Sequence, residues 1–210
     1  MSKLFFIVFL MLVCSSVKAQ PAGYVSVKDV AVFKSQFVTA SQKISSIKAD
    51  FQQEKNLSML SDKIISKGKF WFKKENKVRM EYTQPFQYLM ILNNNNIYIK
   101  DGQKENKIAA SSNKLFQQVN KIVVDCVRGT AFSNTDFKVN VFESKTTYLI
   151  ELTPVAKNLQ QIFKSINVIT DKKDYSVNTI VMNEVSGDNT TIHFINKEIN
   201  TNLNDALFTH

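Results

Sequence analysis

Few residues in this chain could take part in catalysis or bind a metal ion. The two histidines, His193 and His210, lie apart in the sequence, and His193 falls between Ile192 and Phe194 in an alternating stretch that predicts a strand. A zinc or iron site needs about three or four converging His, Cys or acidic ligands. No glycine loop for phosphate, nucleophile elbow or helix with paired histidines or carboxylates occurs in the sequence. The sequence therefore predicts neither an enzyme nor a bound metal or cofactor.

The first nineteen residues have the pattern of a secretory signal peptide. Lys3 supplies the positive charge, residues 4–13 form an unbroken apolar run, and Ala19 ends a stretch typical of a cleavage site. A run of this length is too short to span a bilayer as a helix. We therefore expect residues 1–19 to be removed and residues 20–210 to be exported as a soluble monomer. In an alternative interpretation Cys14 is an acylated cysteine, although Val13 stands before it where a small residue is expected.

The composition describes an exported protein without internal disulfides. Cys126 is the one cysteine that follows the signal peptide, and a single thiol cannot close an internal bridge. The remaining length, residues 20–210, fits a single domain with a well-filled core. The net charge of +9 comes mainly from lysines scattered along the chain, which is typical of a solvated surface. Export argues against nucleic acid as a partner, whereas anionic membrane surfaces and acidic proteins stay open.

Apolar periodicity predicts two amphipathic helices. In the first, residues 26–47, apolar side chains recur at steps of three and four, and Ser26 and Asp29 are expected to form a capping box. The second runs over about residues 113–128, and Gly129 is placed as its C-terminal stop.

Most of the remaining chain alternates apolar and polar residues with the period of two expected for strands. Pro85, the asparagine run 93–96 and Gly102 separate some of these segments, as in antiparallel hairpins. The predicted strands are 47–59, 64–73, 77–82, 86–92, 97–100, 107–110, 137–143, 148–153, 166–170, 179–185 and 190–195. We expect an α+β protein, mainly β, with one sheet of about eleven antiparallel strands that is strongly curved or partly closed.

The aromatic content bears on what such a sheet encloses. Sixteen phenylalanines and six tyrosines are distributed along the chain, many of them on these amphipathic elements. A curved sheet covered by two helices has an interior, and these side chains either fill it as a core or line an apolar cavity beneath the helices. Periodicity alone leaves both possibilities open.

Several motifs resemble the LolA family. They are Phe51-Gln52-Gln53, Gly68-Lys69-Phe70-Trp71-Phe72-Lys73-Lys74, Arg79-Met80-Glu81-Tyr82-Thr83-Gln84-Pro85, and the closing Asp205-Ala206-Leu207-Phe208. The resemblance implies an open, eleven-stranded half-barrel lidded by helices. It also implies a periplasmic carrier, which accepts triacylated lipoproteins from an inner-membrane ABC transporter and passes them to an outer-membrane receptor.

The alternation and the resemblance together predict a lipid-binding cavity. Residues 78, 80 and 82 share one face of their strand, while residues 77, 79 and 81 point the other way. The residues expected to bind lipid are Phe33, Phe37, Phe70, Phe72, Val78, Met80, Tyr82 and Phe116. Met80 stands where the family has tryptophan and Val78 where it has an aromatic residue, so we expect a wider or softer cavity.

One position is expected to gate that cavity. Lys74 corresponds to the functional arginine of the family, and Glu75 replaces the proline that follows it. The resemblance places Lys74 at the cavity mouth, with a looser contact than the planar fork of arginine would make. Two other functions stay open: a carrier of another lipid or acylated pigment precursor, and an envelope sensor or scaffold with a lipid-binding fold.

Overall fold

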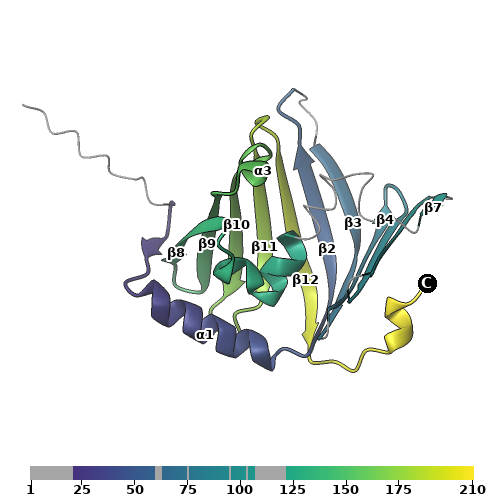
Figure 1. The fold of residues 1–210 in the computed structure, drawn as a ribbon, viewed down its shortest axis with the longest axis horizontal. Coiled ribbons are helices and arrows are strands. Elements are labelled where there is room, and N and C mark those ends of the chain that lie inside the picture. The colour runs from purple at the N-terminus through teal and green to yellow at the C-terminus, as the bar shows by residue number, and fades with distance from the viewer. Residues whose placement is uncertain (1–20, 60–62, 75, 95, 103, 107–121) are drawn as a thin grey trace, which may run out of the picture.

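The computed structural model describes residues 21–210 apart from 60–62, 75, 95, 103 and 107–121, and its main feature is one large antiparallel sheet (Figure 1). The strands are β1 (Val25–Ser26), β2 (Ser46–Asn56), β3 (Lys63–Lys73), β4 (Lys77–Gln84), β5 (Tyr88–Asn93), β6 (Asn96–Asp101), β7 (Lys104–Asn106), β8 (Phe137–Glu143), β9 (Thr147–Pro154), β10 (Phe163–Asp171), β11 (Val177–Glu184) and β12 (Asn189–Ile199). The helical elements are α1 (Val30–Lys43), residues 122–128, α3 (Lys157–Gln160) and the 3-10 turns η1 (Thr130–Ser133) and η2 (Asp205–Phe208). The expected signal peptide, the predicted strand 107–110 and Phe116 lie outside the described residues.

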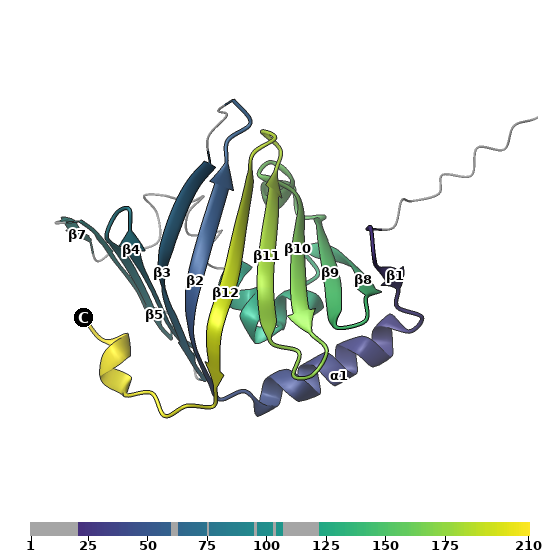
Figure 2. The same cartoon turned by 180° about the vertical axis from the view of Figure 1, so that it is seen from behind.

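The sheet joins two meanders, which Figure 2 shows side by side from behind. Strands β8 to β12 form one meander and β2 to β7 the other, and each strand pairs with the next along the chain. The pair β12 and β2 joins them, with Phe194 opposite Phe51. The predicted fold class is confirmed: the protein is mainly β, with an open sheet of eleven antiparallel strands, and the two-residue β1 adds to it at the β8 edge.

Helix α1 is shorter than the sequence predicts, because its N-terminal cap lies at Asp29. The Asp29 carboxylate accepts hydrogen bonds from the backbone N–H groups of Ala31 and Val32, so the helix begins at Val30. The capping box expected between Ser26 and Asp29 is wrong, since Ser26 pairs with β8 as part of the sheet. The helix ends at Lys43, three residues before β2 begins.

The second predicted helix is seen at its C-terminal end. Residues 122–128 are helical, and the backbone N–H of Gly129 donates to the Cys126 carbonyl at 3.1 Å. Gly129 has a φ of +76°, a left-handed conformation that ends helices and that glycine adopts without strain. The predicted helix stop is therefore confirmed.

The turn between β2 and β3 differs from the prediction of a strand through Met59. Strand β2 ends at Asn56, and the backbone N–H of Ser58 donates to the Asp188 carboxylate in the neighbouring β11–β12 turn at 2.8 Å. Met59, just beyond, is 95% exposed. Strand β2 therefore ends before Met59, the last apolar residue of the predicted strand, where the chain turns and contacts the β11–β12 turn.

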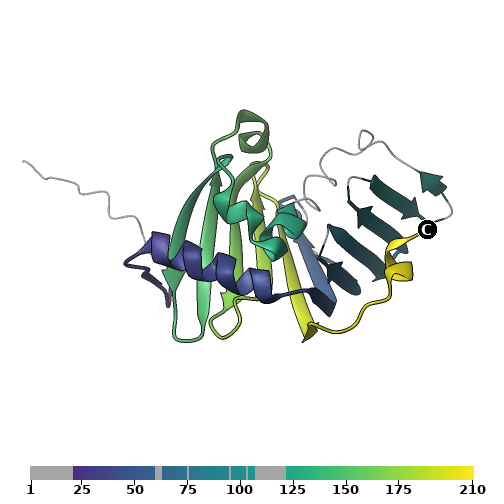
Figure 3. The ribbon, with the colours of Figure 1, turned by 60° about the horizontal axis from the view of Figure 1, so that its bottom comes forward.

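The two faces of the sheet are covered differently (Figure 3). Helix α1 and residues 122–128 lie over one face, which we call the inner face; the C-terminal segment with η2 lies against the other, the outer face. The larger buried cluster combines the apolar side chains of the inner face with Phe33, Phe37 and the apolar side chains at 122–124, 126 and 127. The interior expected from the sequence therefore lies between the sheet and these helices.

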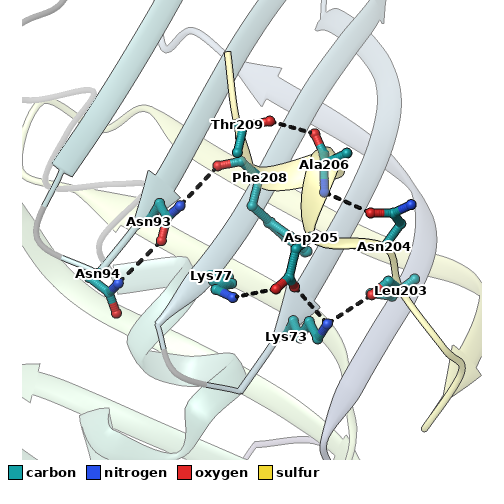
Figure 4. Close-up of polar contacts among 10 residues, drawn as sticks. All are labelled: Lys73, Lys77, Asn93, Asn94, Leu203, Asn204, Asp205, Ala206, Phe208 and Thr209. Carbon is teal, nitrogen blue, oxygen red and sulfur yellow. Dashed lines mark hydrogen bonds and ion pairs between the residues drawn. The ribbon is translucent and has the colours of Figure 1, made fainter.

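A smaller cluster secures the C-terminal segment to the outer face. Leu203 and Phe208 pack with Ile91 and Tyr98 of β5 and β6. At the same place Asp205 accepts hydrogen bonds from the ammonium groups of two lysines, Lys73 at 2.7 Å and Lys77 at 3.1 Å, and Asn93 donates to the Phe208 carbonyl at 3.2 Å (Figure 4). The motif that closes the chain thus acts as a strap across β3, β4 and β5.

Candidate functional site

Five of the predicted lipid-binding residues lie together on the inner face of β3 and β4. Phe70 is paired with Met80, Phe72 with Val78, and Tyr82 lies opposite Gly68. All five side chains are at most 6% exposed. These five side chains therefore form one continuous apolar surface, as strand periodicity predicts, and this surface is buried.

The two predicted residues of helix α1 lie over the other half of the sheet. The Phe33 ring is 4.8 Å from that of Tyr148 on β9, and the Phe37 ring is 4.5 Å from that of Phe132 in η1, both edge to face. Both phenylalanines are buried in the same cluster as the β3 and β4 residues. The predicted set is thus divided between two parts of one apolar interior, and aromatic contacts fix α1 over the β9 side.

The inner face also contains aromatic residues that the predicted set omits. Phe51 of β2 contacts Tyr82 with ring centroids 4.9 Å apart, and Phe194 of β12 contacts Phe70 at 5.2 Å. Both are buried, and both stand at alternating positions in strands that the sequence predicts. The same period of two that selected Met80 could have selected Phe51 and Phe194.

An aromatic path connects the interior to the edge of the inner face. Tyr82 stacks against Phe86 in the turn between β4 and β5, with centroids 5.6 Å apart. Phe86 is 45% exposed, whereas Tyr82 is 3% exposed. Burial raises the pKa of the Tyr82 phenol well above its ordinary value, and the phenol donates a hydrogen bond to the Gln53 side chain at 2.9 Å. Gln53 lies on the same face as Phe51, so the apolar surface is bordered here by polar side chains. We call this edge of the inner face the polar border.

The polar border includes an ion pair between β2 and β11. The Lys55 ammonium lies 2.8 Å from the Glu184 carboxylate, and their side chains are 30% and 11% exposed. Lys55 follows Phe51 and Gln53 at the alternating positions of β2, and Glu184 follows Ile180 and Met182 on β11. Both charges thus lie on the inner face, at the end of β2 farthest from α1.

Lys74 lies where the first helix meets the sheet. Its ammonium donates a hydrogen bond to the carbonyl of Gln42 in the last turn of α1, and its backbone N–H donates to the Ser45 carbonyl at 2.8 Å. Positive charge is favourable at a helix C-terminus, where carbonyl groups lack helical partners. Asn200 supports the same junction, because its side chain donates to the Lys43 carbonyl at 3.1 Å. The expected gating residue therefore contacts the covering helix directly, although its gating role stays a prediction.

A pocket lies between α1 and the turn that joins β10 and β11. It has a volume of about 490 Å³ and is lined by Ser35, Gln36, Thr39, Ala40, Lys43, Ile44, Lys173, Asp174, Tyr175, Ile199 and Asn200. Two of the lining residues contact each other, because the Tyr175 hydroxyl donates a hydrogen bond to the Gln36 side chain at 3.1 Å. The C-terminal half of α1 thus leaves open space beside the sheet.

Among the described residues, no group of three or more His, Cys, Asp and Glu side chains is arranged to hold a metal ion.

The Cys126 thiol is fully buried, and this burial raises its pKa above the ordinary value, so the thiol form dominates at neutral pH. In the part of the chain that the structure describes, no helix has the length and apolarity to span a membrane.

Comparisons with solved structures define the class of fold. The chain is similar to a LolA superfamily protein from Nitrosomonas europaea, with a TM-score of 0.50 and 10% identity over 84% of this chain and 97% of that one. It is also similar to MucB, with a TM-score of 0.53 and 12% identity over 86% of this chain and 64% of MucB. MucB of Pseudomonas aeruginosa in complex with MucA gives 0.50 and 13%, over 84% and 59%. At 10 to 13% identity, these similarities show that the chain shares the fold of these proteins.

The family follows from the sequence itself. The family model described as outer membrane lipoprotein carrier protein LolA matches residues 42–210, most of the chain. The chain therefore belongs to the LolA family. No match is found among curated proteins.

Proposed function

We propose that this protein carries acylated lipoproteins across the periplasm, with their acyl chains against the inner face of the sheet. One observation supports this most directly: in a chain of the LolA family, a continuous apolar surface extends across neighbouring strands from β10 to β4 and forms one buried cluster with residues of α1 and of the helical segment 122–128. Mobile acyl chains need apolar area without fixed polar partners, and this surface supplies it. Met80 and Met182 add flexible side chains that can adapt to such chains.

The packed interior gives a physical route to reversible binding. Burying an acyl chain contributes about 0.8 kcal/mol per methylene, so one long chain supplies on the order of 10 kcal/mol. A carrier must offset most of this to release its cargo. Here cargo would have to displace the covering residues, including Phe33 and Phe37, from the inner face. The lost self-packing lowers the net affinity, because only the difference between the two states drives binding.

Export and partners complete the proposal. The signal-peptide pattern of residues 1–19 directs the chain out of the cytoplasm, with residues 20–210 acting as a monomeric carrier domain. Cargo would come from an inner-membrane ABC transporter that releases lipoproteins and would go to an outer-membrane receptor. No step in this transfer requires catalysis or a cofactor of the carrier.

The test measures bound lipid and transfer separately. The full chain is expressed, the exported protein is purified, and bound amphiphiles are identified by mass spectrometry. The same protein is then mixed with vesicles that hold a triacylated lipoprotein, and lipoprotein in the vesicle-free supernatant is quantified. An unacylated cysteine-to-serine form of the cargo is the control.

We expect acylated peptide on the purified protein and release of the triacylated form from vesicles. Recovery of another lipid in place of acylated peptide, without lipoprotein release, would favour the alternative of a different lipid carrier. Capture of a regulatory membrane protein, with neither lipid nor release, would favour an envelope sensor and contradict the proposal.

A further inference from the structure

Charged side chains reach the inner face at the end of β2 farthest from α1. Lys55 lies 2.8 Å from Glu184, and both belong to the face that is otherwise built from residues such as Phe51, Phe194 and Met182. A second Lys–Glu pair, Lys48 of β2 with Glu198 of the neighbouring β12 at 2.8 Å, lies on the opposite side of the same β2 strand. The inner pair is much less exposed than the outer one, whose side chains are 46% and 50% exposed.

Two carboxylates, those of Glu184 and Asp188, lie in the surroundings of the Lys55 ammonium. The Asp188 carboxylate accepts hydrogen bonds from the Ser58 backbone N–H at 2.8 Å and the Ser58 hydroxyl at 2.9 Å. These hydrogen bonds, and to a smaller degree the charge of Lys55, hold the pKa of Asp188 below its ordinary value. The Lys55 ammonium therefore pairs with Glu184 and also lies near enough to Asp188 to favour its charged form. A bound phosphate would meet more repulsion than attraction here.

An uncharged polar group would find complementary partners at the same place. An ammonium has three donor hydrogens, so Lys55 can keep Glu184 and still donate to an ester or amide carbonyl. The carboxylate of Glu184 has a second oxygen, which can accept from an amide N–H. The glyceryl esters and N-terminal amide of a triacylated lipoprotein present these groups and carry no phosphate.

We propose that Lys55 and Glu184 form a head-group site that favours acylated molecules with ester and amide heads over phospholipids. This rests on the proposed function, because it places the acyl chains on the inner face, over Phe51 and Phe70, with their polar end at Lys55. Selection of this kind matters to a lipoprotein carrier, since phospholipids surround its cargo in every membrane.

The test compares two amphiphiles with the same acyl chain: a monoacylglycerol, whose head is uncharged, and a lysophosphatidic acid, whose head is a phosphate. Their dissociation constants are measured by displacement of a fluorescent fatty-acyl probe. The wild type should bind the monoacylglycerol more tightly. Glu184→Gln should tighten lysophosphatidic acid binding by about fivefold and change monoacylglycerol binding little, because one repelling charge is removed.

Two further variants make the result decisive. Glu198→Gln removes the matched carboxylate from the outer face and should leave both dissociation constants unchanged. Lys55→Gln leaves Glu184 without its ammonium and should weaken lysophosphatidic acid binding further, which keeps the test valid if Glu184→Gln does not fold. An equal preference for the two amphiphiles in the wild type, or no shift in either Glu184→Gln or Lys55→Gln, would overturn the head-group site alone. A wild type that binds neither amphiphile nor the fluorescent probe would overturn the proposed function as well.

Discussion

The ring of Phe51 lies against the backbone of Gly68, its partner on β3. A Cβ atom at position 68 would stand 2.6 Å from the Phe51 ring and 2.1 Å from the carbonyl oxygen of Glu81 on β4. The first neighbour is a buried aromatic side chain and the second is strand backbone, so neither can give way easily. The glycine in this motif is therefore required by close packing on the inner face.

We expect Gly68→Ala to lower the free energy of unfolding by about 2–3 kcal/mol, because the strands must move apart to admit one methyl group. Gly23→Ala is the control: its Cβ would meet open space, although its φ of +79° carries strain of about 1 kcal/mol. Chemical denaturation of both variants measures the difference. Equal losses would mean that the contact with Phe51 and Glu81 does not constrain the sheet.

The hydrogen bond from Lys74 to the Gln42 carbonyl leads to a kinetic prediction. Lys74→Leu removes a cationic donor from the last turn of α1, so the helix should separate from the sheet more often. Uptake and release of a fluorescent acyl chain should both accelerate by about twofold to fivefold, with a small change in melting temperature. Stopped-flow fluorescence measures the rates.

Lys69→Leu is the matched control, because Lys69 is exposed on the outer face of β3, the strand that ends just before Lys74. Lys74→Arg should keep the slow rates, since arginine also donates to carbonyl groups. Unchanged kinetics in Lys74→Leu would show that this contact does not hold the helix closed.

The strap on the outer face should respond to acid through Asp205. Hydrogen bonds from Lys73 and then Lys77 hold the pKa of Asp205 below its ordinary value. A carboxyl group whose pKa is lowered by folding stabilises the fold above its unfolded pKa, and this contribution disappears as pH falls through the folded pKa. Asp205→Asn should therefore melt below the wild type at neutral pH, and the gap should close well below about pH 4. A gap that persists in strong acid would contradict this origin. Salt should narrow the gap, because Asp205 is 62% exposed.

The sequence predicts the strands well because each one alternates between a buried and an exposed side. That period identified Met80 and Tyr82 as neighbours on one face, and the register with Phe70 confirms it. Contacts between distant segments leave no such local pattern. Lys55 and Glu184 are 129 positions apart, and each alone resembles a surface charge. Pairing of β11, β12 and β2 brings them together, so only the folded sheet reveals the polar border.

The helical elements also depend on contacts with distant segments, which the local sequence does not predict. Periodicity found α1, but Ser26 could equally cap a helix or pair in a sheet, and the edge of β8 decides which. The closing residues 205–208 resemble a family motif without indicating that Asp205 faces Lys73 and Lys77. Their role depends on the outer face of the sheet, which forms from strands more than a hundred residues earlier in the chain.

The proposed competition between self-packing and cargo makes its sharpest prediction at Met80. This side chain is 1% exposed in the inner cluster, so Met80→Ala should lower the free energy of unfolding by about 2–4 kcal/mol. In an ordinary core the truncation would leave an unfilled cavity. In a carrier an acyl chain can fill that space, and less self-packing is lost when the chain enters. The variant should therefore bind a fluorescent fatty-acyl probe at least about threefold more tightly while melting earlier.

Ile91→Ala is the control for that prediction, because Ile91 is 2% exposed but packs beneath the strap on the outer face. It should lose similar stability without any gain in acyl affinity. Thermal melts and probe titrations on the two variants separate a general loosening of the fold from a change at the binding surface. If both variants gain affinity equally, loosening alone explains the effect. If Met80→Ala gains none, the inner face around Met80 is a core that cargo does not enter.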